Sequence, residues 1–193
     1  MVIDKPIKDL KVFSAIGMAT FKGFITNGLD SSTLINLIVV FDSKFEEYKK
    51  RGFTFPPNLF CYHEVSVPEV IGILINKHGF TKDEAKEALR KLVNEFSLTK
   101  IIRIQELDAP FEKLVEETNI KVVSKYNNNP NLTIGDQDII IIAGFLRNNV
   151  NFVHSADEGF LKTCEELKIN TIPTPKRDLE RENEIKKWLK RKK

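Results

Sequence analysis

The chain has few cysteines and none of the common nucleotide-binding or hydrolase motifs. Of its 193 residues only Cys61 and Cys164 are cysteines, with no CxxC pair and no histidine at ligand spacing. We interpret both as reduced structural cysteines rather than as a disulfide or a zinc site. P-loop, GxGxxG, GxSxG and HExxH patterns are all absent from the sequence. The function classes that these motifs mark are therefore not indicated.

Long apolar runs are also missing. A membrane-spanning helix needs about 20 predominantly apolar residues, whereas the apolar run over 35–41 ends at Asp42. The first eleven residues, MVIDKPIKDLK, lack the apolar core of a signal peptide. We therefore expect a cytoplasmic protein without membrane contact.

The charge is unevenly distributed. Residues 176–193 hold nine Lys and Arg against four Asp and Glu, a net charge of +5, so the other residues carry −2. A basic tail suggests a polyanionic partner, and a solvated terminal helix is an equally good interpretation. Trp188 could stack on a base there or dock the tail on protein. We divide the chain into an extension over 1–22, a domain over 23–175 and a basic tail over 176–193.

Apolar spacing and helix-capping patterns predict alternating strands and helices. Ser66 and Glu69 fit a capping box, as do Thr81 and Glu84, and Gly79 fits a helix end. We predict strands over 23–30, 100–105, 149–155 and 169–172. We predict helices over 31–51, 66–77, 81–96, 139–146 and 160–167, and another from Asp108 whose end is open because 120–126 fits a strand or a helix. Residues 53–62 and 127–131 are predicted loops. This alternation indicates a three-layer α/β/α sandwich with a mostly parallel central sheet.

Acidic residues stand at the junctions of these predicted elements. Asp30 and Asp157 follow strands, and Glu69 and Asp138 begin helices. Each has an ordinary structural explanation as a helix cap or turn residue. If Asp136 caps the helix at 139–146, Asp138 points elsewhere, because residues two apart do not share a helix face.

The joint occurrence of these acids is more informative than any one of them. In a parallel sheet, the carboxyl ends of strands and the N-termini of the following helices lie along one edge. Asp30, Glu69, Asp138 and Asp157 could therefore converge on one pocket. Clustered carboxylates repel one another, and Mg²⁺ or Mn²⁺ relieves that repulsion while accepting oxygen ligands. Such a site can activate water for phosphodiester hydrolysis.

Four segments resemble, in order, the motifs of the PIN domain family, metal-dependent ribonucleases that include VapC-type toxins and RNA-processing nucleases. They are LDSSTLI at 29–35, SVPEVIGIL at 66–74, DIIIIA at 138–143 and VHSADEGF at 153–160. The resemblance covers about residues 23–172. It implies an endoribonuclease in which Asp30, Glu69, Asp138 and Asp157 surround Mg²⁺ or Mn²⁺.

The same resemblance suggests further residues and partners. Ser31 and Ser155 occupy the polar supporting positions of the family, and Asp136 and Glu158 are additional acidic candidates. RNA is the implied substrate, and an antitoxin-like protein and a second copy of the chain are implied partners. In the tail, the candidate RNA-binding residues are Lys186, Lys187, Trp188, Lys190 and Arg191.

Departures from the family pattern leave other functions open. Ser155 stands where Thr is commoner, and Glu158-Gly159 replaces the usual residues before Phe160. A PIN-like module that binds RNA or protein without efficient cleavage is the main alternative. A phosphatase or phosphoacceptor is a poorer one, because neither DxDxT nor a leading Asp pair is present.

Overall fold

A computed structural model describes residues 24–39 and 58–174 of the chain. Within them, five parallel strands form one sheet in the order β3-β2-β1-β4-β5. The strands are β1 (Ile25–Leu29), β2 (Asn58–His63), β3 (Thr99–Ile101), β4 (Phe152–Ser155) and β5 (Asn170–Pro173). The helices are α2 (Ser31–Val39), α4 (Ser66–His78), α5 (Lys82–Glu95), α6 (Gln105–Lys125), α7 (Asp136–Arg147) and α8 (Glu158–Glu166), with a 3₁₀ turn, η1 (Pro130–Leu132). The predicted α/β sandwich is confirmed.

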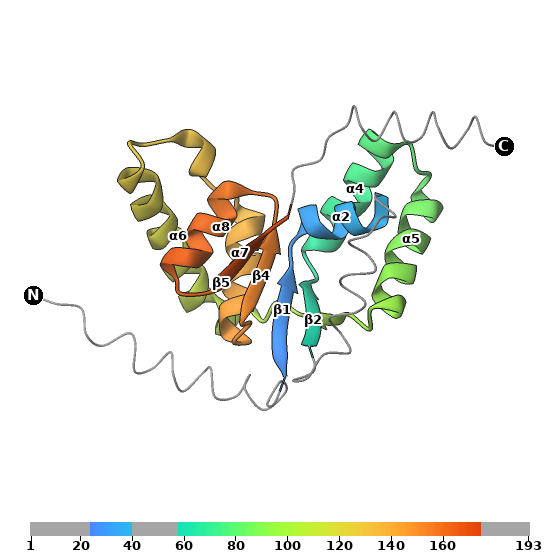
Figure 1. Cartoon of the computed structure of the whole chain (residues 1–193), viewed down its shortest axis with the longest axis horizontal. Coiled ribbons are helices and arrows are strands. Elements are labelled where there is room, and N and C mark those ends of the chain that lie inside the picture. The colour runs from blue at the N-terminus through green and yellow to red at the C-terminus, as the bar shows by residue number, and fades with distance from the viewer. Residues whose placement is uncertain (1–23, 40–57, 175–193) are drawn as a thin grey trace, which may run out of the picture.

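The helices cover both faces of the sheet (Figure 1). Helices α2, α4 and α5 lie on one side, and α6, α7 and α8 lie on the other. Each side has its own core of buried side chains. Strand β2 contributes side chains to both cores. Phe60 and Tyr62 pack with the first group of helices, and Cys61 packs with the second. A strand buried on both faces has an uninterrupted apolar sequence, and Leu59 to Tyr62 fits this description.

The strand order places a topological switch point between β1 and β4. The chain passes from β1 to β2 and β3 on one side, and it later returns to β4 on the other side of β1. In open parallel sheets the crevice at the carboxyl ends of two such strands is where ligands bind. Asp30 follows β1 directly, and β4 ends at Ser155. These two residues therefore flank the crevice.

Most predicted elements are present, and two local signals are confirmed in detail. The Thr81–Glu84 capping box forms in both directions at the start of α5. Gly79 ends α4 with φ of 70°, a left-handed conformation that glycine adopts without strain. Residues 120–126, for which strand and helix were both open, are helical through Lys125.

Two predictions in the first half of the domain are wrong. Residues 58–62 are not a loop but part of β2, next to the central strand. Ser66 is not the N-cap of α4: the cap is Val65, no side chain caps the helix, and Glu69 takes part in no capping box. The turn after β2 satisfies its own donors, because His63 Nδ1 accepts from the Val65 N–H and the Glu64 carbonyl accepts from the Val67 N–H.

The third strand and the following helix also differ from the prediction. Strand β3 ends at Ile101, and α6 begins at Gln105 rather than at Asp108. The reason is that side-chain carboxylates accept hydrogen bonds from the backbone here. The Arg103 N–H donates to Glu64 and the Ile104 N–H donates to Asp108, so the chain leaves the ladder and enters the helix early.

Several predictions fall on residues that the structure does not describe. They concern the extension over 1–22, the part of the first predicted helix beyond Val39, and the tail over 176–193 with Lys186, Lys187, Trp188, Lys190 and Arg191. In the described ranges, none of the helices has the length and apolar character needed to cross a membrane.

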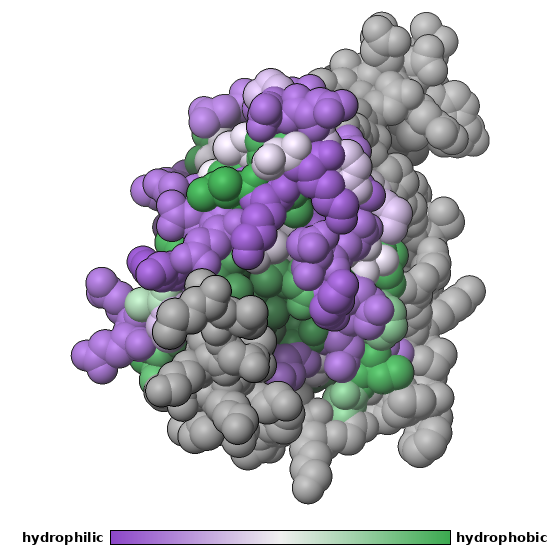
Figure 2. Space-filling view, turned by 90° about the vertical axis from the view of Figure 1, so that its left-hand side faces the viewer, coloured by the Kyte–Doolittle hydropathy of each residue, from purple (hydrophilic) through white to green (hydrophobic). Residues whose placement is uncertain are grey.

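Helix α6 has one face toward the core and one toward solvent. Phe111, Val115 and Val122 are buried on the inner face, while the described surface on this side of the molecule is mostly hydrophilic with smaller hydrophobic areas (Figure 2). Ile120 in the helix and Tyr126, the residue after it, are large apolar side chains that are exposed. The helix therefore acts as an outer layer of the sandwich.

Close packing between α7 and β2 gives a test of the fold. A Cβ atom on Gly144 would lie 2.4 Å from His63 Cδ2, so Gly144→Ala should reduce the free energy of unfolding by about 1–3 kcal/mol. Gly72 in α4 has no atom within 4 Å of its added Cβ, and Gly72→Ala should be stabilising by about 0.5–1 kcal/mol. Urea unfolding of both variants measures these changes. Equal effects in the two variants would contradict the packing described here.

Candidate functional site

Asp30 lies at the centre of the polar contacts at the carboxyl edge of the sheet. Its N–H donates to the His154 carbonyl of β4. Its carboxylate accepts hydrogen bonds from Thr33 N (2.8 Å), Ser32 Oγ (2.9 Å) and Ser155 Oγ (2.5 Å). The bond from Thr33 N is the N-cap contact expected from the structural interpretation of Asp30. The carboxylate thus caps α2 and also ties that helix to β4.

Two serines complete this connection. Ser155 Oγ accepts from the Asp157 N–H (2.9 Å), and Ser32 Oγ accepts from the Ala156 N–H (2.9 Å). Ser155 therefore supports Asp30 directly, whereas the Oγ of Ser31 is buried and makes no hydrogen bond in the described structure. Ser32 occupies the supporting role that the sequence suggested for Ser31. The signal for it was the hydroxyl two residues after an N-cap aspartate.

The other three predicted acids lie at helix N-termini. Asp157 caps α8, accepting from the Phe160 N–H at 2.7 Å. Asp138, in the first turn of α7, accepts from the Gly135 N–H at 3.2 Å. Glu69 lies in the first turn of α4 and accepts no hydrogen bond from the described residues. The positive ends of these helix dipoles therefore face the carboxylates and partly offset their charge.

The charges of the other three acids act on Asp138. The pKa of Asp138 is raised to about 6, first by burial and then by the charges of Asp157, Glu69 and Asp30. The pKa of Asp30 is also raised to about 6, by burial that outweighs its hydrogen bonds from Ser155, Thr33 and Ser32. The largest causes of the two shifts are burial, hydrogen bonds and, for Asp138, neighbouring carboxylates, so this edge is acidic.

The donor chemistry of this edge fits a hard divalent cation. All four side chains are carboxylates, the ligand type that Mg²⁺ and Mn²⁺ prefer. One oxygen of Asp138 and one of Asp157 carry no hydrogen bond from the described residues, and Glu69 has both oxygens available. Over 24–39 and 58–174, however, no three His, Cys, Asp or Glu side chains are spaced to hold a metal ion. Binding would require the carboxylates to close together.

The remaining acidic candidates are exposed first residues of helices. Asp136 and Glu158 are the first residues of α7 and α8 and are exposed. Neither accepts a hydrogen bond within the described parts of the chain. They add negative charge to the same edge but do not belong to the bonded group around Asp30.

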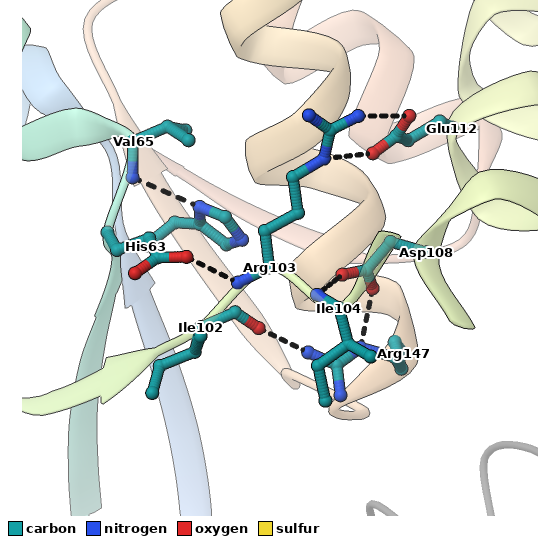
Figure 3. A network of polar contacts seen from close by, with 9 residues as sticks. His63, Val65, Ile102, Arg103, Ile104, Asp108, Glu112 and Arg147 are labelled. Carbon is teal, nitrogen blue, oxygen red and sulfur yellow. Dashed lines mark hydrogen bonds and ion pairs between the residues drawn. The ribbon is translucent and has the colours of Figure 1, made fainter. Parts of the chain in front are cut away.

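A separate polar network lies where β2 and β3 end (Figure 3). Arg147 Nε and the Ile104 N–H both donate to the fully buried Asp108 carboxylate, and Arg103 forms a two-point ion pair with Glu112. His63 lies beside this network, fully buried, and burial lowers its pKa to about 4. The contacts join β3, α6 and α7, so the network has a structural role.

Removing the buried charge of Asp30 should change the pH dependence of stability. With a pKa near 6 in the folded chain and 3.8 when unfolded, Asp30 takes up a proton on folding between these two pH values. The unfolded state then binds fewer protons, so stability falls as pH rises from about 4 to 6. Between pH 4 and pH 7, Asp30→Asn should gain stability relative to wild type by on the order of 3 kcal/mol.

Urea unfolding in the presence of a chelator measures this difference. Glu116→Gln, an exposed change on α6, is the matched control and should show no such trend. A constant difference between Asp30→Asn and wild type across this pH range would contradict the description of Asp30 as a destabilised buried carboxylate.

Comparison of the chain with protein-family models and with curated proteins gives no match to either.

Proposed function

We propose that this chain is a Mg²⁺- or Mn²⁺-dependent endoribonuclease that hydrolyses RNA phosphodiester bonds. The observation that carries the proposal is that the charges of Asp157, Glu69 and Asp30 all raise the pKa of Asp138, at the carboxyl edge of a parallel sheet. Stability alone gives no reason to gather like charges in this way, because their mutual repulsion costs free energy. Their placement is explained if they bind a cation there.

The chain's own residues have distinct roles in this proposal. Asp30 is held in place by Ser155, Ser32 and Thr33, so it is the preorganised ligand. Glu69, Asp138 and Asp157 would complete the ligand set with their available oxygens. A bound divalent cation would supply a nucleophilic water at neutral pH and stabilise charge on the scissile phosphate.

The resemblance to PIN domain nucleases supports the same function. The fourth motif departs from the family pattern at Ser155, yet this hydroxyl donates directly to Asp30. A serine therefore makes the supporting contact at this position. By the same resemblance we propose RNA as substrate, an antitoxin-like protein or a second copy as partner, and the cytoplasm as location.

The main alternative is a PIN-like module that binds RNA or protein without efficient cleavage. The observation that favours it is that Asp30, Asp138 and Asp157 already make hydrogen bonds at helix N-termini, while no metal-binding group of three is present in the described chain. Thermal unfolding with and without Mn²⁺ separates the two. Binding to the native state raises its stability, so the nuclease should melt at higher temperature in millimolar Mn²⁺. No change in melting temperature would favour the module.

Cleavage assays test the proposed chemistry directly. Asp30→Asn and Asp157→Asn should each reduce hydrolysis of single-stranded or structured RNA by at least about 100-fold, because each removes a ligand charge that stabilises the transition state. Glu116→Gln should retain wild-type activity. Full activity in both site variants, or in the wild type after removal of divalent metal, would contradict the proposal.

A further inference from the structure

One buried side chain of α6 connects the segment before α7 to α8. Asn119 is only 6% exposed. Its Nδ2 donates to the Leu132 carbonyl (2.8 Å) and to Thr163 Oγ1 (2.9 Å), and its Oδ1 accepts more weakly from the Ile134 N–H (3.4 Å). Leu132 and Ile134 belong to the segment between α6 and α7, whereas Thr163 belongs to α8. Helices from the same side of the sheet (Figure 1) are therefore joined at one amide.

These contacts continue to the start of α8, where Asp157 lies. Thr163 Oγ1 donates in turn to the Gly159 carbonyl (2.8 Å) in the first turn of that helix. A Cβ atom on Gly159 would lie 2.8 Å from the Leu132 oxygen, so the segment packs directly on this turn. Asp157 caps α8 just before Gly159. The hydrogen bonds of Asn119 therefore fix the segment against the helix start that carries Asp157.

The other end of the segment leads directly to Asp138. Ile134 is followed by Gly135, the N-cap of α7, and the Gly135 N–H donates to Asp138 Oδ2 (3.2 Å). Of the neighbouring acids, Asp157 has the largest effect on the pKa of Asp138. These two carboxylates are thus electrostatic neighbours, and the contacts of Asn119 join the helix starts from which they extend.

Stability alone does not call for a buried amide at this place. Apolar groups of the same shape can replace a hydrogen-bonded pair with little loss of stability. Hydrogen bonds differ from apolar contacts in being directional, so a satisfied buried network specifies one arrangement of the elements that it joins. A metal site needs such precision, because its ligands must be held within about 0.5 Å of the productive geometry.

We propose that Asn119 is a positioning residue that fixes the starts of α7 and α8 relative to each other, so that Asp138 and Asp157 bind the same divalent cation. The inference rests on the proposed nuclease function. It adds a residue outside the acidic group on which the affinity for the cation depends. Asn119 acts through the backbone of the segment before α7 and through Thr163, and it takes no part in the bond-breaking step.

Mn²⁺ affinity tests this role without requiring cleavage. The full-length chain is titrated with Mn²⁺, and the free ion is measured by electron paramagnetic resonance at a temperature at which circular dichroism shows each variant to be folded. Asn119→Leu removes all three hydrogen bonds at similar side-chain size. It should raise the Kd for Mn²⁺ by about 10-fold or more, since residues that orient metal ligands typically contribute about 10–100-fold to affinity. Thr118→Val, the matched control, removes a hydrogen bond to the Leu114 carbonyl within α6 and should leave the Kd unchanged.

The Mn²⁺ dependence of RNA cleavage gives a second measurement that a loss of stability alone does not change. For Asn119→Leu, the Mn²⁺ concentration at half-maximal cleavage should rise by the same factor as the Kd, while the rate at saturating Mn²⁺ stays close to that of the wild type. Thr163→Val removes the hydrogen-bond partner on α8 at nearly constant size. It should shift both values in the same direction, and it provides the test where Asn119→Leu does not fold.

The outcomes separate this role from the nuclease function itself. An unchanged Kd in Asn119→Leu and Thr163→Val, or an equal rise in Thr118→Val, would overturn the positioning role and leave the nuclease function standing. A lower maximal rate with an unchanged Kd would also overturn it, because Asn119 would then affect a step other than cation binding. A wild type that binds no Mn²⁺ would refute both.

Discussion

The contact on which the site depends is the hydrogen bond from Ser155 to the buried Asp30 carboxylate. Through it, the end of β1, the first turn of α2 and the end of β4 become one unit, since Ser32 and Thr33 donate to the same carboxylate. Thr174 joins this unit through Ser155 and Thr33. Asp30 therefore holds these elements together, and among the four acids its carboxylate accepts the most hydrogen bonds.

The arrangement has an energetic cost that its structural roles do not explain. Burial raises the pKa of Asp30 and of Asp138, and neighbouring carboxylates add to the shift of Asp138, so the folded chain disfavours the ionised forms of both. Capping a helix needs only one oxygen acceptor, and Ser or Asn would provide it at no such cost. Titratable groups held in an unfavourable environment are common at functional sites. The cost is consistent with selection for charge at this place.

Most of the fold and the candidate residues could be predicted from local sequence signals, and the errors have physical causes. Thr81 with Glu84, Gly79 and the acids after strands are recognised by chemistry within a few residues. Strand β2 was missed because prolines precede an apolar run whose partner strands are distant in sequence. The start of α4 without a side-chain cap depends on His63, and the second bond of Ser32 comes from Ala156, far away in the sequence; no local pattern encodes these contacts. The topology of parallel sheets predicts that the four acids lie along one edge. How far apart their carboxylates lie cannot be predicted from the sequence.

The central claim is that the four carboxylates bind one divalent cation, and a crystal structure of the full chain grown with Mn²⁺ tests it most directly. Anomalous scattering identifies the ion independently of the protein geometry. The account predicts an anomalous peak at the carboxyl edge, with Asp30 and at least two of Glu69, Asp138 and Asp157 at ligand distances of roughly 2.0–2.2 Å from the ion, close to those of the similar cation Mg²⁺. A well-occupied manganese ion elsewhere, with these side chains still apart and uncoordinated, would contradict it.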